Sequence, residues 1–200
     1  MRLVETTSFR RGKLPHWEIK GGRYFVTVRL ADSLPRDVVA RLQEIHHSLS
    51  AVKSASTQFT ALHREYFQTM EKYLDAGTGA CLLRDSIAAT IVRDELIALD
   101  DWSVAVPHYS IMPNHWHALL VPAPDCTHSL DEIIQRLKGR TGRRIRAATK
   151  TSGTGPMWQR ERFDRWMRDD AEWEKTVTYI RNNPINAGLA ARWEEHAWTR

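Results

Sequence analysis

The sequence predicts an α+β protein, built on an antiparallel sheet with helices on one face. Three observations lead to this prediction. The 200 residues correspond to about one domain, because single cores stop growing beyond about 250–300 residues. Segments with strand-like alternation and segments with helical periodicity follow one another along the chain. The 42% hydrophobic and 26% charged residues are ordinary globular values, which argue against a disordered or membrane protein.

The first half of the chain is expected to form one strand followed by helices. Residues 22–30 alternate β-branched and aromatic side chains, which is typical of a strand. Pro35 suits the first turn of a helix whose apolar stripe continues to about residue 46. Apolar side chains spaced by three and four predict further helices over 51–74 and 84–99, and the glycine-rich residues 75–79 break the pattern between them.

The second half is expected to return to strands and then end in a helix. Strand-like runs over 103–112 and 116–121 are joined by a turn and should be neighbours in the sheet. Ser129 and Glu132 form a capping box at the start of a basic helix. The remaining predicted elements are a loop over 147–156, a short strand over 163–168 and a helix over 170–181 that ends before Asn183–Pro184.

Positive charge is concentrated in one part of the chain. The overall charge of +5 hides residues 135–168, where eleven basic and two acidic residues give +9, so the rest sums to about −4. Nine of the eleven are arginines, whose planar guanidinium suits phosphate. The segment predicts nucleic-acid binding, although a solvated helix face is the alternative. The candidate contacts, including one indole that could stack on a base, are Arg136, Lys138, Arg140, Arg143, Arg144, Trp158, Arg160 and Arg162.

A His-x-His motif lies in the second of the two adjacent strands. In a strand, residues i and i+2 face the same way about 6.7 Å apart, so His115 and His117 present their imidazoles together while Trp116 faces the opposite side. Two adjacent imidazoles indicate a metal site. The alternative is two partly exposed histidines on a sheet surface.

A second candidate group lies on the last predicted helix. Tyr179 and Asn183 are four residues apart and therefore share a helix face. An amide oxygen can complete a cation site that two imidazoles begin, and a metal on a phosphate would assist attack by the phenol. Taken alone, the pair is better read as a core tyrosine at a helix end with an asparagine cap.

These motifs, taken together, resemble the REP-associated tyrosine transposases, a branch of the single-tyrosine transposases within the HUH endonuclease superfamily. The resemblance rests on Met-Pro-Asn-His-x-His at 112–117 and on the tyrosine helix with its continuation at 179–189. Further matching segments lie at 24–30, 79–85 and 158–163.

The resemblance implies a single HUH transposase domain over 1–200, with a ferredoxin-like core and a helical insertion at about 46–79. It implies that Tyr179 is the nucleophile and that His115, His117 and Asn183 hold Mg²⁺ or Mn²⁺. The reaction would cleave single-stranded DNA beside a repetitive extragenic palindrome hairpin, leaving a 5′-phosphotyrosine and a free 3′-hydroxyl, and the same site would rejoin strands.

The family resemblance also sets expectations about partners and leaves alternatives open. No apolar run could span a membrane, so we expect a cytoplasmic bacterial protein that associates with the nucleoid when bound to DNA. We expect a monomer rather than a dimer that exchanges tyrosine helices.

One alternative is a domesticated relative that binds DNA or RNA hairpins without cutting them. Another is a relaxase or replication initiator, although the tyrosine-to-asparagine spacing argues against it.

Overall fold

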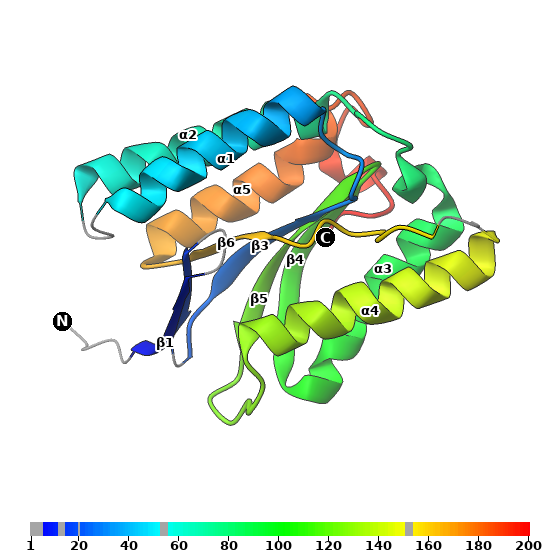
Figure 1. Cartoon of the computed structure of the whole chain (residues 1–200). Helices are drawn as coiled ribbons and strands as arrows, with labels where there is room; N and C mark the ends of the chain where they lie inside the picture. Colours follow the sequence, from blue (N-terminus) through cyan, green and yellow to red (C-terminus); the bar gives the residue numbers. More distant parts are fainter. Residues whose placement is uncertain (1–5, 12–14, 20, 53–55, 151–153) are drawn as a thin grey trace.

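The protein folds around one four-stranded sheet that lies between two layers of helices (Figure 1). The computed structural model describes residues 6–11, 15–19, 21–52, 56–150 and 154–200. None of the helices within these ranges combines the length and the apolar character needed to cross a membrane.

Every neighbouring pair of strands in the sheet is antiparallel, and the strand order is β4-β5-β3-β6. At the outer edge of β4, the segment Trp198–Arg200 adds backbone hydrogen bonds to Tyr109 and Ile111. The strands of the sheet are β3 (Tyr24–Arg29), β4 (Val104–Met112), β5 (His115–Pro122) and β6 (Phe163–Trp166).

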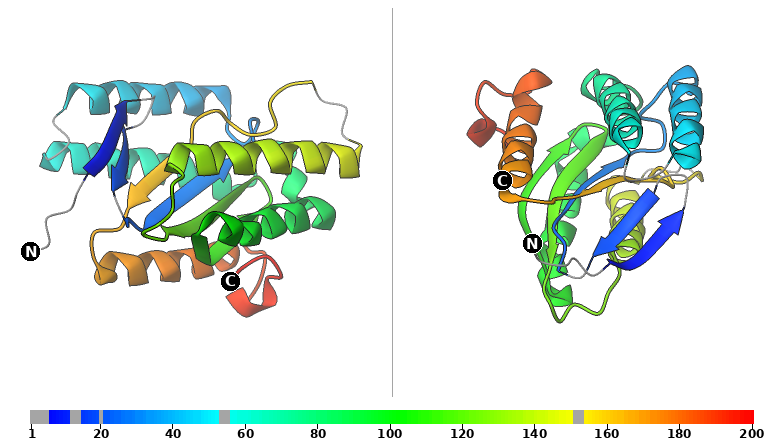
Figure 2. Two further views of the ribbon diagram at one scale, coloured as in Figure 1. Left: turned by 90° about the horizontal axis from the view of Figure 1, so that it is seen from below. Right: turned by 90° about the vertical axis from the view of Figure 1, so that its left-hand side faces the viewer.

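Helices cover both faces of the sheet, which corrects the prediction of helices on one face (Figure 2). Tyr24, Val26 and Trp116 face the layer formed by α3 and α4, whereas Phe25 and Leu119 face the layer formed by α1, α2 and α5. The helices are α1 (Arg36–Ala51), α2 (Thr57–Asp75), α3 (Ser86–Ile97), α4 (Leu130–Thr149) and α5 (Asp170–Asn186). Short 3₁₀ turns are η1 (Leu82–Arg84), η2 (Ala98–Trp102) and η3 (Trp193–Glu195).

The connectivity explains why helices cover both faces of the sheet. Strand β3 leads through helices to β4, the hairpin β4-β5 follows, and α4 connects β5 to β6. This strand-helix-strand-strand-helix-strand order is the ferredoxin-like plan, and its two crossover helices α3 and α4 share a face as that plan requires. The additional helices α1 and α2, with α5, cover the opposite face. The α+β class is therefore confirmed. Helices α1 and α2 lie between β3 and α3, and the insertion expected at about 46–79 stays a prediction.

Other differences from the sequence predictions have local causes. Helix α5 continues through Pro184 to Asn186, because a proline in the last turn removes only one backbone hydrogen bond, and the chain leaves the helix at Gly188 (φ +67°). Helix α4 extends through Thr149 into the predicted loop. A hairpin of β1 (Thr6–Arg11) and β2 (Pro15–Ile19) was not predicted. Parts of the predicted 51–74 helix and 147–156 loop, at 53–55 and 151–153, lie outside the described residues.

Candidate active site

The two histidines of the His-x-His motif lie side by side on β5, facing the α1, α2 and α5 layer. Their Nε2 atoms are 2.9 Å apart, and both side chains are fully buried. Trp116, between them, packs into the opposite core as the strand alternation predicts. The imidazole of His117 stacks on Phe25 of the neighbouring strand, with ring centroids 5.4 Å apart. The structure therefore places the pair in the core rather than on an open sheet surface.

Hydrogen bonds to the other ring nitrogens determine which atoms can bind a cation. The Asn114 side chain donates from Nδ2 to the Thr78 carbonyl, so its Oδ1 can only accept, and Nδ1 of His115 donates to it at 2.7 Å. A neutral imidazole carries one N–H, so Nε2 of His115 keeps a free lone pair. Burial lowers the pKa of His115 well below its usual value, and the neighbouring His117 lowers it further, which keeps the ring neutral.

Thr27 supports the second imidazole from β3. Its Oγ1 lies 2.9 Å from Nδ1 of His117, and a hydroxyl can either donate to or accept from that nitrogen. The Thr27 hydroxyl can therefore accept a hydrogen bond from the tautomer of His117 that carries its proton on Nδ1. In that tautomer the Nε2 of His117 has a free lone pair and can bind a cation. Such hydrogen bonds behind metal-binding histidines fix the ring orientation and the tautomer.

Tyr179 and Asn183 reach the same point from α5. The Tyr179 hydroxyl lies 3.3 Å from Nε2 of His117, and Nδ2 of Asn183 donates to the hydroxyl oxygen at 3.1 Å. Asn183 is 1% exposed. The structure therefore brings together all four residues that the sequence motifs single out, from the separate elements β5 and α5.

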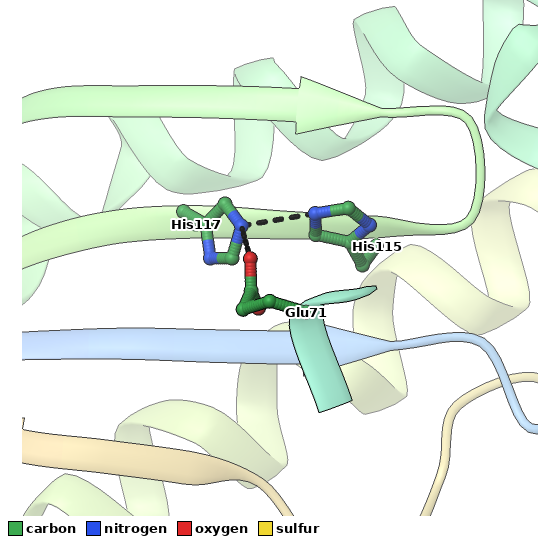
Figure 3. Close-up of side chains that lie close together, drawn as sticks. All are labelled: Glu71, His115 and His117. Atoms are coloured by element: carbon green, nitrogen blue, oxygen red, sulfur yellow. Dashed lines mark hydrogen bonds and ion pairs between the residues drawn. The ribbon is translucent and has the colours of Figure 1, made fainter. Parts of the chain in front are cut away.

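Glu71 on α2 completes the group and was missed by sequence reasoning (Figure 3). Its carboxylate accepts a hydrogen bond from the Tyr179 hydroxyl, and its Oε2 lies 3.5 Å from Nε2 of His117. Ligand atoms of Glu71, His115 and His117 all lie within 4.8 Å of one another. A signal was present, because Glu71 sits beside Met70 and Leu74 on the buried side of an amphipathic helix, where a carboxylate is costly unless partnered.

The buried oxygens of this group indicate a cation. Oε1 of Glu71 and Oδ1 of Asn183 are buried and have no hydrogen-bond partner among the described residues. Unsatisfied buried oxygens are rare in folded proteins, and a bound ion or an ordered water would satisfy them. With the two imidazole nitrogens they form a mixed nitrogen and oxygen donor set, which fits a divalent transition ion such as Mn²⁺ better than Mg²⁺, which prefers oxygen ligands throughout.

Burial, together with nearby negative charge, holds the phenol of Tyr179 in its protonated form. Burial raises the pKa of Tyr179 well above its usual value, and the charge and hydrogen bond of Glu71 raise it further. One helical turn after Glu71, burial and the Glu71 charge raise the pKa of Asp75 to about 6. Two acids one turn apart therefore face the same site, and a bound cation would stabilise both carboxylates.

Comparison with known proteins finds a family model that matches the part of the chain carrying the histidines and the tyrosine. Residues 90–183 match the family model of IS200-like transposases. This IS200-like segment spans 94 of the 200 residues and contains His115, His117, Tyr179 and Asn183. The match confirms the resemblance to transposases indicated by the motifs. Glu71, α1 and α2 lie outside it.

Solved structures show more distant likenesses, and no curated protein matches the chain. A REP-associated tyrosine transposase bound to a REP hairpin aligns with 96% of this chain and 81% of its own, at 14% identity and a TM-score of 0.47. A protein from Deinococcus radiodurans R1, provisionally described as a transposase, aligns with 79% of this chain and 87% of its own, at 15% identity and a TM-score of 0.37.

Much of the basic stretch of the IS200-like segment lies away from the tyrosine. Helix α4 packs on the α3 layer, on the opposite face of the sheet from α5 (Figure 1). Arg140 and Arg144 of α4 both pair with the buried Glu95 of α3, at 2.6 and 2.7 Å. Their guanidinium groups therefore join the two helices as well as adding positive charge to the surface.

Other basic side chains of the predicted set also have structural partners. Lys138 donates to the carbonyls of Gln159 and Arg160, and burial lowers its pKa to about 8. Arg162, whose side chain is 9% exposed, lies 2.5 Å from Asp131 and 3.1 Å from Asp164. Arg136 lies over the Trp102 ring, 3.9 Å from its centroid. Lys138 and Arg162 therefore hold the 159–164 segment against α4.

Two exposed arginines of the set have no ion pair among the described residues, and the tryptophan is buried. Arg143 and Arg160 are exposed, and no ion pair of either is found within the described ranges. Trp158 is 5% exposed, and its Nε1 donates to Oγ1 of Thr141 at 2.9 Å within the core. The structure thus corrects the expectation that Trp158 stacks on a base: the indole fills the space above Gly142 of α4.

Proposed function

We propose that this protein is a metal-dependent endonuclease and strand transferase for single-stranded DNA, with Tyr179 as its nucleophile. The observation that carries the proposal is the Tyr179 hydroxyl, 3.3 Å from Nε2 of His117 and hydrogen-bonded to Glu71 and Asn183. A core tyrosine needs only one hydrogen-bond partner. A phenol among two imidazoles, an amide and a carboxylate is the arrangement expected of a nucleophile beside a cation site.

Each residue has a defined part in the proposed reaction. His115, His117, Glu71 and the Asn183 oxygen would hold the cation, Mn²⁺ or Mg²⁺. When bound, the ion would neutralise charge on the scissile phosphate and on the phenol oxygen. Asn183 and Glu71 fix the direction of the hydroxyl, while Asn114 and Thr27 fix the imidazole rings.

The proposed chemistry is a transesterification that conserves the phosphodiester energy. A bond forms between the Tyr179 oxygen and phosphorus, and the bond from phosphorus to the 3′-oxygen breaks. The proton lost by the phenol is balanced by the proton gained at the new 3′-hydroxyl. The 5′-phosphotyrosine can then be attacked by another 3′-hydroxyl, which rejoins a strand without ATP.

The proposed substrate is a single strand that carries a hairpin of the repetitive extragenic palindrome type. The support is the motif resemblance, the family match and the exposed arginines Arg143 and Arg160. Tyr179 and its partners all come from one chain, with no second copy needed to complete the group. We therefore propose a monomer that cuts with its own tyrosine, which light scattering on the purified protein tests.

The deciding experiment is a covalent-adduct assay. A labelled hairpin-bearing single strand incubated with Mn²⁺ should give a protein–DNA adduct that survives denaturing electrophoresis. The adduct should be absent in Tyr179→Phe and in EDTA, and present in Tyr73→Phe, which removes a phenol of α2 outside the group. An adduct in Tyr179→Phe would exclude this nucleophile. Hairpin binding by the wild type without any adduct would instead support the non-cleaving relative.

A further inference from the structure

A pocket next to the histidine pair has no assigned role. It opens to solvent between α1, α2, β3 and the 159–163 segment and encloses a small space of about 60 Å³. Thr27 and Arg29 form its floor on β3, Gln43 and Tyr66 come from α1 and α2, and Gln159 closes the opposite wall. Phe163 lines it as well. Helices α1 and α2 lie outside the residues that match the family model.

Arg29 is a buried guanidinium without an acidic partner. The residue is 8% exposed, and its only described side-chain hydrogen bond goes from NH1 to Oγ of Ser33 at 3.3 Å. Within the described ranges no carboxylate forms an ion pair with it. Burial lowers the pKa of Arg29, which reflects the cost of a charge that the protein leaves unneutralised. A buried arginine that faces a pocket in this way is suited to a ligand that brings acceptor atoms or negative charge.

The pocket shares a wall with the candidate active site. In the β3-β5 register, Arg29 lies opposite His115, and Thr27 lies opposite His117. The hydroxyl of Thr27 both contacts His117 and lines the pocket. A molecule in the pocket would therefore lie directly beside a phosphate at the histidine pair.

The lining chemistry favours a nucleobase over a bare phosphate. Tyr66 and Phe163 offer aromatic surface, and Gln43 and Gln159 carry amides that both donate and accept. Glu161 also lines the pocket, where its carboxylate would repel an inorganic anion but accept a hydrogen bond from a base amino group. Arginine, glutamine and carboxylate are the side chains that read base edges, and aromatic rings bind base faces.

We propose that this pocket binds one unpaired nucleotide of the DNA strand, with its base inside, adjacent to the scissile phosphate. The assignment of the strand rests on the proposed function. Because the pocket depends on α1 and α2, these helices would select the nucleotide that flanks the cleavage site.

The test uses nucleotides alone, so that it does not depend on cleavage. The four deoxynucleoside 5′-monophosphates and deoxyribose 5-phosphate are titrated into isotope-labelled protein, and the side-chain signals of Arg29, Gln43 and Gln159 are followed by NMR. At least one nucleotide should bind about tenfold more tightly than deoxyribose 5-phosphate, as expected when a base is stacked and hydrogen-bonded. Equal binding of the nucleotides and of deoxyribose 5-phosphate would overturn the proposal and show that the pocket binds only an anion. The absence of any nucleotide binding would refute the proposal as well.

Two variants test the location. Gln43→Trp fills the pocket from an exposed position on α1 and should weaken nucleotide binding about tenfold. Gln68→Trp, at an exposed position of α2 that does not line the pocket, should bind as the wild type does. Unchanged binding in Gln43→Trp would place the nucleotide elsewhere and overturn the proposal. Nucleotide binding without a DNA adduct would refute only the proposed cleavage by Tyr179. A DNA adduct without nucleotide binding would refute only the proposed nucleotide pocket.

Discussion

The hydroxyl of Tyr179 donates a hydrogen bond to the carboxylate of Glu71, a residue 108 positions earlier in the chain. Tyr179 belongs to the family-matched segment, whereas Glu71 belongs to helix α2, which lies outside that segment. Helix α2 therefore contributes a side chain to the candidate site as well as covering it. This contact makes α2 part of the chemistry proposed for the protein.

The first prediction concerns Glu71 as a cation ligand. Glu71→Gln keeps the size of the side chain and removes its charge, so Mn²⁺ affinity should fall by at least about tenfold. Isothermal titration calorimetry measures the change. Glu65→Gln alters a partly exposed carboxylate of the same helix and should leave the affinity unchanged. Equal affinities in all three proteins would show that Glu71 only positions the phenol.

A second prediction concerns stabilisation by metal. A ligand that binds only the folded state at about 100 times its dissociation constant adds about 2.7 kcal/mol, which raises the melting temperature of a 200-residue protein by about 5–10 °C. Mn²⁺ should give a larger rise than Mg²⁺ at equal concentration, because two of the four donors are imidazole nitrogens. Differential scanning fluorimetry should show the rise in wild type and its loss in His115→Ala. A rise that persists in this variant would place the ion elsewhere.

The local motifs of the candidate site were predictable, and its long-range partner was not. Strand alternation placed His115 and His117 on one face, and helical spacing placed Tyr179 and Asn183 together. Glu71 depends on how α2 docks against the sheet, and no local pattern specifies that docking. The position of Glu71 on the buried side of an amphipathic helix was a signal of burial, but it did not identify the histidines and the tyrosine as the partners of Glu71.

The partners of the basic side chains in residues 135–168 were likewise not predictable from the sequence. Counting charges located a positive stretch but could not tell which arginines have carboxylate partners. Arg140 and Arg144 neutralise a buried glutamate, and Arg162 lies between two aspartates. These pairings form between residues up to 49 positions apart, so they become visible only in the folded chain.

A third prediction separates DNA-binding arginines from structural ones. Arg143→Gln and Arg160→Gln should each weaken hairpin binding and lower the salt dependence of log K by about 0.7–0.9, because each removes one exposed phosphate contact. Fluorescence anisotropy across a salt series measures both effects. Arg162→Gln should instead lower the free energy of unfolding by about 3–5 kcal/mol, since it removes one member of the buried ion pair between Arg162 and Asp164. Loss of DNA binding in a fully stable Arg162→Gln variant would contradict this division.

A fourth prediction tests the buried tryptophan. Trp158→Phe removes the hydrogen bond to Thr141 and part of the core volume, so unfolding should become about 1–3 kcal/mol easier. Urea denaturation measures this cost. Affinity for hairpin DNA should stay the same, because the indole is not available to a base. A variant with unchanged stability and weakened DNA binding would restore the stacking role.

The last prediction is a pH dependence of folding stability that comes from His63. This imidazole packs between Phe59 and Phe163, and burial, helped by the nearby charge of Arg165, lowers its pKa from 6.5 to about 4. The unfolded chain therefore takes up a proton at His63 at a higher pH than the folded protein does. Stability from this residue is complete above pH 6.5 and is lost as the pH falls from 6.5 toward about 4. Because the ring keeps some contact with solvent, we expect a loss of about 1–3 kcal/mol.

His63→Gln removes the titrating group and should flatten this part of the pH profile. Urea unfolding of wild type and variant at about pH 7 and about pH 5 isolates the effect, since the other titrating groups are common to both proteins and cancel in the difference. His47→Gln, which alters an exposed imidazole on α1, is the matched control. If His63→Gln lost as much stability as the wild type between the two pH values, the imidazole would not be held neutral by its aromatic surroundings, and the packing of α2 against β6 would have to be looser than the ring contacts indicate.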